Sequence, residues 1–281
     1  MGRRAFERGW LDPSIHLLAV ALLACTSTEG TTPDDPLTSD GGSRQRAEPS
    51  PDGEGSPGPS DPPPGGKSYC ASIATSTAGV KASFCADFDD DLMKGWSSRL
   101  VQHGETRHQE QSFVAETTAV EENVPARAYL RKDFTELSTD IDYSFSVRID
   151  QIGAVPNKGG TIAVLQFGEY PYEYKVQLNV YAGGRAALVE IGPAGADGGP
   201  RAYAEHELPS FTPGTWKRVA IRMSDGKLDV AMDGAIVIGA PVPVVVTPPS
   251  APPSFFLGTV FIDPPSSPWR VRFDDVTVNL R

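Results

Sequence analysis

Two long segments of the chain alternate strictly between apolar and polar residues. They cover residues 140–150 and 172–181. Successive side chains of a β-strand point to opposite sides of the sheet, so each segment is predicted to be a strand with one buried side and one solvent-facing side. Their polar side chains include Arg148, Lys175, Gln177, Asn179 and Tyr181.

Between these segments, residues 161–169 form a nearly continuous apolar run, as expected of a central strand. Gln166 interrupts this run, and an amide buried there without a partner would be unfavourable. Gln166 is therefore a candidate for a ligand-facing position. Tyr170 follows beside Pro171 in a predicted turn, where its ring would be free to stack on a ligand.

Two hairpins are predicted late in the chain. Asp225-Gly226 and Asp233-Gly234 each separate two alternating runs, and Asp-Gly is typical of two-residue hairpin turns because both positions require positive φ. No segment after residue 68 repeats its apolar residues with the period of a helix. We therefore predict one all-β domain over residues 68–281, built as a sandwich of two antiparallel sheets.

The N-terminal residues have the pattern of an export signal. Three arginines within the first eight residues precede the apolar run Leu17–Ala24, which is far shorter than the ~20 residues that cross a bilayer. The ending Leu-Leu-Ala-Cys at residues 22–25 resembles a bacterial lipobox, which implies a signal peptide over residues 1–24 and lipidation of Cys25. A plain secretory signal is the alternative. Thr26 replaces the aspartate that favours inner-membrane retention, so an outer-membrane lipoprotein is expected.

Residues 26–66 differ abruptly in composition from the rest of the chain. Of these 41 residues 17 are Pro or Gly, and eight acidic residues against two arginines give a net charge of −6. Such a segment buries too little apolar surface to offset its ordering entropy, so residues 25–67 are expected to be a disordered, membrane-tethered linker. The net charge of the whole chain, −11, argues against a nucleic-acid partner because phosphate binding needs a basic surface.

The chain contains three cysteines. With Cys25 acylated, Cys70 and Cys85 remain as a pair, and exported proteins fold in an oxidising compartment. We therefore expect a Cys70–Cys85 disulfide that fixes the segment entering the domain onto the first strand. A metal site is the alternative, but no histidine or third cysteine lies near this pair in the sequence.

The hairpin region carries a recognisable pattern. Residues 214–234 contain Gly-Thr-Trp, then Val219, Ile221, Leu-Asp-Val and Asp-Gly, a spacing that resembles the G-x-W-x-x-V-x-I … L-x-V-x-x-D-G signature of laminin G-like domains. Residues 272–278 are similar to the final strand of many bacterial members of the concanavalin A-like lectin and glucanase superfamily. The resemblance covers most of residues 80–281. It implies a jelly roll of two antiparallel sheets, one concave, whose first and last strands are neighbours, but no particular activity.

The chain lacks the acidic motif of enzymes with this fold. Glucanases of the superfamily carry E-[ILV]-D-x-x-E on one strand, and neither Glu190 nor Asp140 begins such a sequence. No G-x-S-x-G occurs, and the four histidines, His16, His103, His108 and His206, lie in no recognisable nucleophile context. We therefore expect no catalytic residues and favour binding over catalysis.

Related folds hold glycans on a polar sheet face or rim through hydrogen bonds and aromatic stacking. The resemblance therefore makes the polar strand residues and one turn tyrosine the candidate ligand-binding set: Arg148, Gln166, Lys175, Gln177, Asn179, Tyr181 and Tyr170. Alternation alone would also produce them as solvated strand residues. Trp216 is expected to lie in the core.

The triplet Phe-Asp-Asp occurs at residues 88–90 and again at 273–275. Around the second triplet the apolar residues change from odd to even positions: Val271 and Phe273, then Val276, Val278 and Leu280. If all of them face the core, one extra residue must form a β-bulge. If the terminal strands pair, Asp89 and Asp275 approach each other and are candidates for a structural Ca²⁺ site. The alternative is that these carboxylates bond backbone N–H groups or protect a strand edge.

These features together predict an exported, lipid-anchored protein whose domain binds a glycan or polysaccharide without turning it over. No cofactor other than structural Ca²⁺ is expected. Two alternatives remain open: a diverged glycoside hydrolase or polysaccharide lyase, and a protein-binding adhesin or structural component of the envelope.

Overall fold

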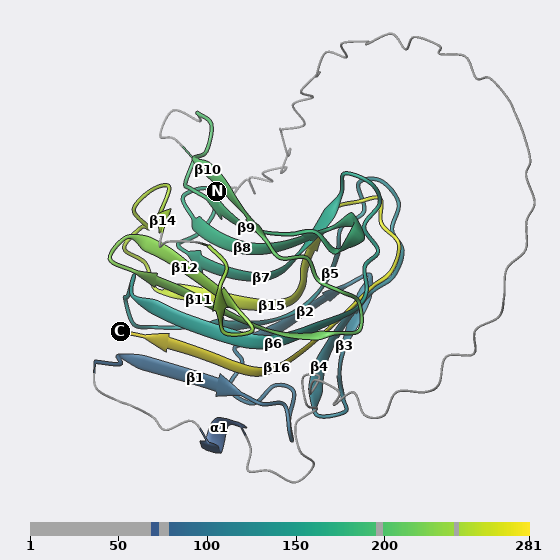
Figure 1. Cartoon of the computed structure of the whole chain (residues 1–281), viewed down its shortest axis with the longest axis horizontal. Helices are drawn as coiled ribbons and strands as arrows, with labels where there is room; N and C mark the ends of the chain where they lie inside the picture. Colours follow the sequence, from purple (N-terminus) through teal and green to yellow (C-terminus); the bar gives the residue numbers. More distant parts are fainter. Residues whose placement is uncertain (1–68, 73–78, 195–198, 239–241) are drawn as a thin grey trace, which may run out of the picture. The chain divides into compact units, whose positions relative to one another are not determined.

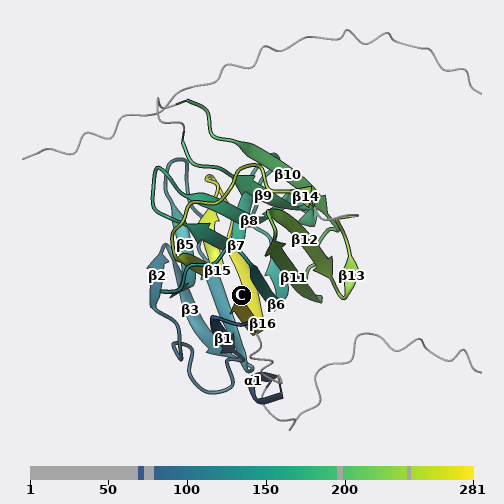
Figure 2. The same cartoon turned by 90° about the vertical axis from the view of Figure 1, so that its left-hand side faces the viewer.

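The structure is a computed structural model, and it describes residues 69–72, 79–194, 199–238 and 242–281. The predicted signal peptide, Cys25 and the linker to residue 67 lie outside the described residues. Two antiparallel sheets pack face to face (Figures 1 and 2), which confirms the predicted all-β sandwich. The described helices are α1 (Tyr69–Ser72) and the 3-10 turn η1 (Ala182–Gly184). No helix among the described residues has the length and hydropathy to cross a membrane.

Nine strands form the first sheet, which we call sheet A: β1 (Ala82–Ala86), β3 (Gly104–Gln109), β4 (Ser112–Thr117), β6 (Ile141–Gln151), β11 (Trp216–Ser224), β12 (Lys227–Met232), β13 (Ala235–Ile236), β14 (Val242–Pro243) and β16 (Trp269–Leu280). The hydrogen-bonded order is β13-β12-β11-β6-β16-β4-β3, with β1 beside β16 and β14 beside β12. The long strands β6 and β16 therefore form the middle of the sheet.

Seven strands form the second sheet, sheet B: β2 (Ser98–Gln102), β5 (Ala126–Asp133), β7 (Gly159–Phe167), β8 (Tyr174–Tyr181), β9 (Ala186–Ile191), β10 (Tyr203–Leu208) and β15 (Pro253–Ile262). Their order is β10-β9-β8-β7-β15-β5-β2. Figure 1 shows β7, β8 and β9 as neighbouring, curved ribbons. β7 lies in the middle of the sheet, as its continuous apolar sequence predicts.

The core lies between the two sheets. Along β6 and β8 every second residue is buried, as the alternating sequence predicts. Aromatic side chains fill its centre, where Phe255 of sheet B lies 6.3 Å from Phe145 of sheet A between ring centroids. Trp216 is not part of this core, and that expectation was wrong. In β11 the odd-numbered residues Val219 and Ile221 face inward, so the even-numbered Trp216 points outward, where the Arg148 guanidinium lies over its ring.

Both predicted hairpins are present. Ser224 pairs with Lys227 across the Asp225-Gly226 turn, and β13 pairs back onto β12 across Asp233-Gly234. The φ angles of the two aspartates are 52° and 51°, and those of the glycines 67° and 79°. These positive angles are what a type I′ turn requires, so the local sequence determines both reversals.

β16 closes sheet A and contains the predicted bulge. Its residues 269–273 pair with β4, and its residues 276–280 pair with β1, so the strand changes its edge partner at Asp274 and Asp275. On its other side the register with β6 shifts between Asp274 and Thr277. The change from odd to even apolar positions is thereby absorbed, and both halves of the strand keep their apolar side chains in the core.

The entering segment is fixed as predicted. Cys70 of α1 and Cys85 of β1 form a disulfide with their Cα atoms 5.8 Å apart. Arg218 of β11 donates a hydrogen bond to the Tyr69 hydroxyl, and its guanidinium lies 5.0 Å from the centre of the tyrosine ring. The chain therefore enters the domain over the outward side of sheet A.

Candidate functional site

Most of the predicted ligand-binding residues lie on the outward side of sheet B. We use the name sheet B face for the outward side chains of β5, β7, β8 and β15. Five of the seven candidates lie on it: Gln166, Lys175, Gln177, Asn179 and Tyr181. The alternate residues of β8 are buried in the core, so the side chains of these polar residues point out together.

The amides on the sheet B face retain hydrogen-bonding capacity. Gln166 Nε2 donates to the Gly168 carbonyl at 2.9 Å, so half of this amide is satisfied by its own turn. Asn179 Oδ1 accepts from Thr161 Oγ1 at 2.8 Å, which leaves its Nδ2 group. Within the described chain, Gln177 has no side-chain hydrogen bond. Together these groups offer both donors and acceptors to a ligand.

Two arginines of β5 complete this face, and the sequence analysis missed both. Arg131 Nε donates to Asp133 Oδ1 at 2.6 Å, and its guanidinium lies 5.2 Å from the centre of the Phe256 ring. Arg127 has a buried Nε that bonds to no described residue, and no described carboxylate pairs with it. Residues 126–131 alternate apolar and basic or aromatic side chains, so the period-two pattern was available as a signal.

Aromatic rings lie beside these polar groups. Tyr129 and Phe256 meet edge to face at 5.6 Å between ring centroids. The Arg185 guanidinium lies 4.4 Å from the centre of the Tyr181 ring. Tyr170 is 83% exposed in the turn between β7 and β8, where only Arg201 lies over its ring among the described residues. Rings of this kind are suited to stack on the apolar side of a sugar.

Arg148 lies elsewhere. It belongs to β6, so it lies on sheet A and not on a strand adjacent to β7 and β8. Alternation places Arg148 and Gln166 on outward sides alike, but the two strands belong to different sheets. The candidate set is thus divided, and Arg148 cannot contact the same ligand unit as Gln166.

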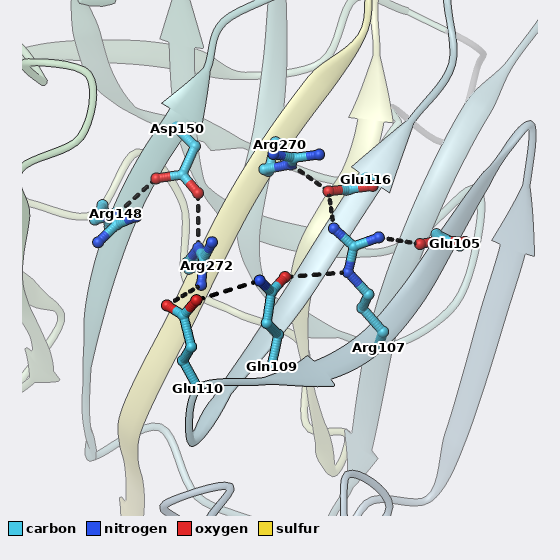
Figure 3. Close-up of polar contacts among 9 residues, drawn as sticks. All are labelled: Glu105, Arg107, Gln109, Glu110, Glu116, Arg148, Asp150, Arg270 and Arg272. Carbon is cyan, nitrogen blue, oxygen red and sulfur yellow. Dashed lines mark hydrogen bonds and ion pairs between the residues drawn. The ribbon is translucent and has the colours of Figure 1, made fainter.

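Figure 3 shows what surrounds Arg148. Arg148 and Arg272 both donate to Asp150, each at 2.6 Å, and Arg272 also donates to Glu110 at 2.9 Å. Arg272 is only 6% exposed. Burial alone would raise the pKa of Asp150, but the hydrogen bonds from Arg148 and Arg272 hold it below its ordinary value. We call these four side chains the arginine ladder.

Further ion pairs follow beside the arginine ladder, from β16 across to β4 and β3. Glu116 accepts hydrogen bonds from Arg270 and from Arg107, and Arg107 also bonds Glu105 (Figure 3). Each arginine drawn in Figure 3 has a carboxylate partner and each carboxylate an arginine. This part of sheet A is therefore internally neutralised, which favours a structural role over a binding role.

The two Phe-Asp-Asp triplets meet as the terminal strands pair. Burial, together with the charge of Asp275, raises the pKa of Asp274 to about 7. Burial also raises the pKa of Asp275 and of Asp89, and the charge of Asp87 adds to both shifts. A pocket of about 280 Å³ lies against Asp87 and Asp89. The donor chemistry fits Ca²⁺, but no three carboxylate, histidine or cysteine side chains of the described residues already surround a common point.

The described histidines do not form a catalytic group. His103 lies in an exposed turn, and His108 lies exposed on β3. His206 Nε2 lies 2.9 Å from Glu190 Oε1, while Glu190 Oε2 accepts from Tyr174 at 2.6 Å and from the Val245 amide at 3.0 Å. Glu190 is fully buried, so a substrate cannot reach this carboxylate.

The chain matches no protein-family model and no curated protein. Among solved structures it is similar to the alginate lyase Aly36B, with a TM-score of 0.52 and 12% identity over 72% of this chain and 99% of the lyase. The fold is concanavalin A-like. A GlcNAcα1-4Gal-releasing endo-β-galactosidase from Clostridium perfringens gives a TM-score of 0.51 at 12% identity, over 72% of this chain and 63% of that one. At such identities the likeness establishes the fold alone.

Proposed function

We propose that the protein binds a glycan on the sheet B face without turning it over. The observation that carries this proposal is the free hydrogen-bonding capacity of Arg127 and Gln177. The Arg127 guanidinium has no carboxylate partner among the described residues, so a ligand oxygen can serve as an acceptor for it. The contrast with the arginine ladder on sheet A, where each arginine has its carboxylate, supports a role in binding.

The composition of this face suits a saccharide. Sugar hydroxyls both donate and accept hydrogen bonds, and the face presents an amide at Gln177, a guanidinium at Arg127 and the aromatic pair of Tyr129 and Phe256. The names of the two similar structures, an alginate lyase and an endo-β-galactosidase, support a polysaccharide as the ligand class. The resemblance of the hairpin region to laminin G-like domains is in accord with binding.

A glycan array probed with the purified protein, with and without a calcium chelator, tests this proposal. Bound glycans are then titrated by calorimetry against Arg127→Gln and Gln177→Ala. We expect Arg127→Gln to weaken binding about tenfold or more, because a hydrogen bond to a charged group contributes ~1.5–3 kcal/mol. Gln177→Ala should weaken binding severalfold, because a neutral hydrogen bond contributes ~0.5–1.5 kcal/mol. The matched controls Arg107→Gln and Gln151→Ala, both on sheet A, should leave the affinity unchanged. Binding of no glycan in either condition would overturn the proposal.

The second candidate is a diverged glycoside hydrolase or polysaccharide lyase, because both structures cited above are enzymes. Glu205 and Glu207 of β10 lie two residues apart and both are exposed, so they share one side of the strand next to β9. Release of reducing ends or unsaturated products from a polysaccharide panel, abolished in Glu205→Gln or Glu207→Gln, would establish catalysis. Absence of products with a glycan that binds would support the binding role.

We further propose that Cys25 carries a lipid that anchors the protein in the outer membrane. The short apolar run before Cys25 and the disulfide between Cys70 and Cys85, which requires an oxidising compartment, support export. Fractionation of cells that express Cys25→Ala tests the anchor. The variant should leave the membrane fraction, and its retention there would show that the anchor assignment is wrong.

We also propose that Asp89 and Asp275 bind a structural Ca²⁺. Burial raises the pKa of each carboxyl group and the charge of Asp87 adds to both shifts, and a divalent ion bound between the carboxylates would offset this repulsion. Addition of millimolar Ca²⁺ to chelated protein should raise Tm, and Asp275→Asn should abolish the increase. An equal increase in the variant, or none in the native protein, would exclude this site.

A further inference from the structure

Sheet A carries a groove that belongs neither to the sheet B face nor to the arginine ladder. The registers of four neighbouring strands place one small outward side chain from each in a single row: Ala231 of β12, Ala220 of β11, Ser144 of β6 and Thr277 of β16. Their chain neighbours, such as Ile221 and Val278, are buried in the core. Because all four side chains are short, the row forms the floor of a pocket of about 220 Å³, which we call the sheet A groove.

Longer polar residues stand on one side of this floor. The next row along the strands consists of Asp229, Arg222, Asp142 and Asn279, and all four line the pocket. On the other side of the floor, Arg218 donates to Ser144 Oγ at 2.7 Å, and its guanidinium lies 5.0 Å from the centre of the Tyr69 ring. The sheet A groove is therefore a shallow depression over small side chains, two alanines and two hydroxyl residues, with a row of longer polar residues along one side.

The polar side of the groove contains groups that the described protein leaves unused. Asp229 Oδ1 is buried and has no hydrogen-bond partner among the described residues. The Asn279 amide likewise bonds to no described side chain or backbone group. Arg222 is 58% exposed and contacts Asp142 only through Nε, at 3.4 Å. The Asp229 carboxylate, the Asn279 amide and the guanidinium of Arg222 therefore line the groove side by side without a full set of hydrogen-bond partners among the described residues.

These groups indicate which ligand chemistry is suitable. Asp142 is already neutralised, since Arg281 Nε donates to it at 2.7 Å and Arg222 lies on its other oxygen. A free anion would meet the unpaired carboxylate of Asp229, and a metal cation would meet Arg222. A neutral polyhydroxylated ligand avoids both repulsions, because a hydroxyl can donate to Asp229 and accept from Arg222.

We propose that the sheet A groove binds a single saccharide unit, with its C–H side on the methyl groups of Ala220 and Ala231. The volume, below the ~300–1,000 Å³ of sites for drug-sized molecules, suits one sugar ring better than a chain. This site is independent of the one proposed on the sheet B face, and either can exist without the other. With both sites occupied, the two outer sides of the sandwich hold separate glycan residues.

The test is an NMR titration of the ¹⁵N-labelled protein with the methyl glycosides of glucose, galactose, mannose and N-acetylglucosamine. At least one should cause saturable shifts of the Ala231 amide and the Asn279 side-chain amide. Ala231→Trp, which fills the floor, and Asp229→Asn, which removes the unpaired charge, should each weaken this binding tenfold or more. The control substitution Asp225→Asn, in an exposed turn outside the groove, should not change it.

The outcomes separate this site from the one proposed on the sheet B face. Gln177→Ala should leave the shifts in the groove intact, and their loss in that variant would assign the signal to the sheet B face. No shift with any of the four glycosides, or full binding by Asp229→Asn, would overturn the proposal. Thermal unfolding of Ala231→Trp checks that it folds, and if it does not, Asp229→Asn alone decides.

Discussion

The carbonyl oxygen of Asp275 accepts a hydrogen bond of 2.6 Å from Nη1 of Arg218, although β6 lies between the strands of these two residues. Asp275 has a φ of 52° in the bulge, where the ladder between β16 and β6 shifts its register. Arg218 supplies a hydrogen-bond donor at the point where the backbone pairing between β16 and β6 is interrupted. Its other nitrogen bonds Ser144 and Tyr69, so one side chain connects the closing strand, the sheet and the entering segment.

Arg218→Gln should therefore lower the free energy of unfolding by about 2–3 kcal/mol, because a hydrogen bond from a charged donor contributes ~1.5–3 kcal/mol. Arg222→Gln on the same strand is the control, since its exposed ion pair should contribute less than ~1 kcal/mol. Urea unfolding of both variants measures the difference. Equal stabilities would show that the bulge does not depend on Arg218.

The buried carboxyl of Asp274 predicts a pH-dependent stability. Its pKa is 3.8 in an exposed chain and about 7 in the folded protein, so the folded state binds this proton more tightly. The corresponding stabilisation is complete below about pH 4 and is lost as the pH rises to about 7. Relative to Asp274→Asn, the native protein should lose up to ~4 kcal/mol across this range, since a tenfold change in proton affinity is ~1.4 kcal/mol.

Urea unfolding at several pH values in calcium-free buffer checks this result. Asp225→Asn, which removes a carboxylate from an exposed turn, is the matched control and should keep the pH dependence of the native protein. The same dependence in Asp274→Asn would mean that another group is responsible.

The arginine ladder should be strongly coupled. Arg272 is almost completely buried, so Asp150→Leu alone leaves a buried charge with Glu110 as its remaining partner and should destabilise by about 3 kcal/mol. Arg272→Met combined with Asp150→Leu should destabilise less than the sum of the single substitutions, by at least ~1 kcal/mol. A double-mutant cycle on the surface ion pair of Arg281 and Asp142 is the control. Its coupling free energy should be below ~1 kcal/mol. If the effects of Arg272→Met and Asp150→Leu on the free energy of unfolding simply add, the two side chains are not coupled and this prediction is wrong.

Glu190 connects β8, β10 and the segment after β14 through its two oxygens. Glu190→Ala would leave the Tyr174 hydroxyl and the Val245 amide without their acceptor. We expect this to lower the free energy of unfolding by about 2–4 kcal/mol. Glu207→Ala on the exposed side of β10 should change the stability by less than ~0.5 kcal/mol. Calorimetric Tm values distinguish the two variants. An unchanged Tm in Glu190→Ala would show that water replaces the carboxylate.

Local sequence was sufficient for much of this fold. Alternation predicted the segments of β6 and β8, the Asp-Gly pairs predicted both hairpins, and the parity change between Phe273 and Val276 predicted the bulge in β16. Each of these features depends on residues close in sequence, because the period of a strand and the φ angles of a turn are local properties.

The composition of the candidate sites depended on tertiary structure. Alternation states which side of a strand is solvent-facing, but it does not state to which sheet the strand belongs, so Arg148 and Gln166 received the same prediction and lie on different sheets. The missing partner of Arg127 and the row of small side chains under the sheet A groove arise from register between strands far apart in the chain. The sequence alone thus determined strands, turns and the inward side of each strand. Only the order and register of the strands in the two sheets decided which polar residues meet, because these depend on contacts between residues far apart in the chain, such as Ser144 and Thr277.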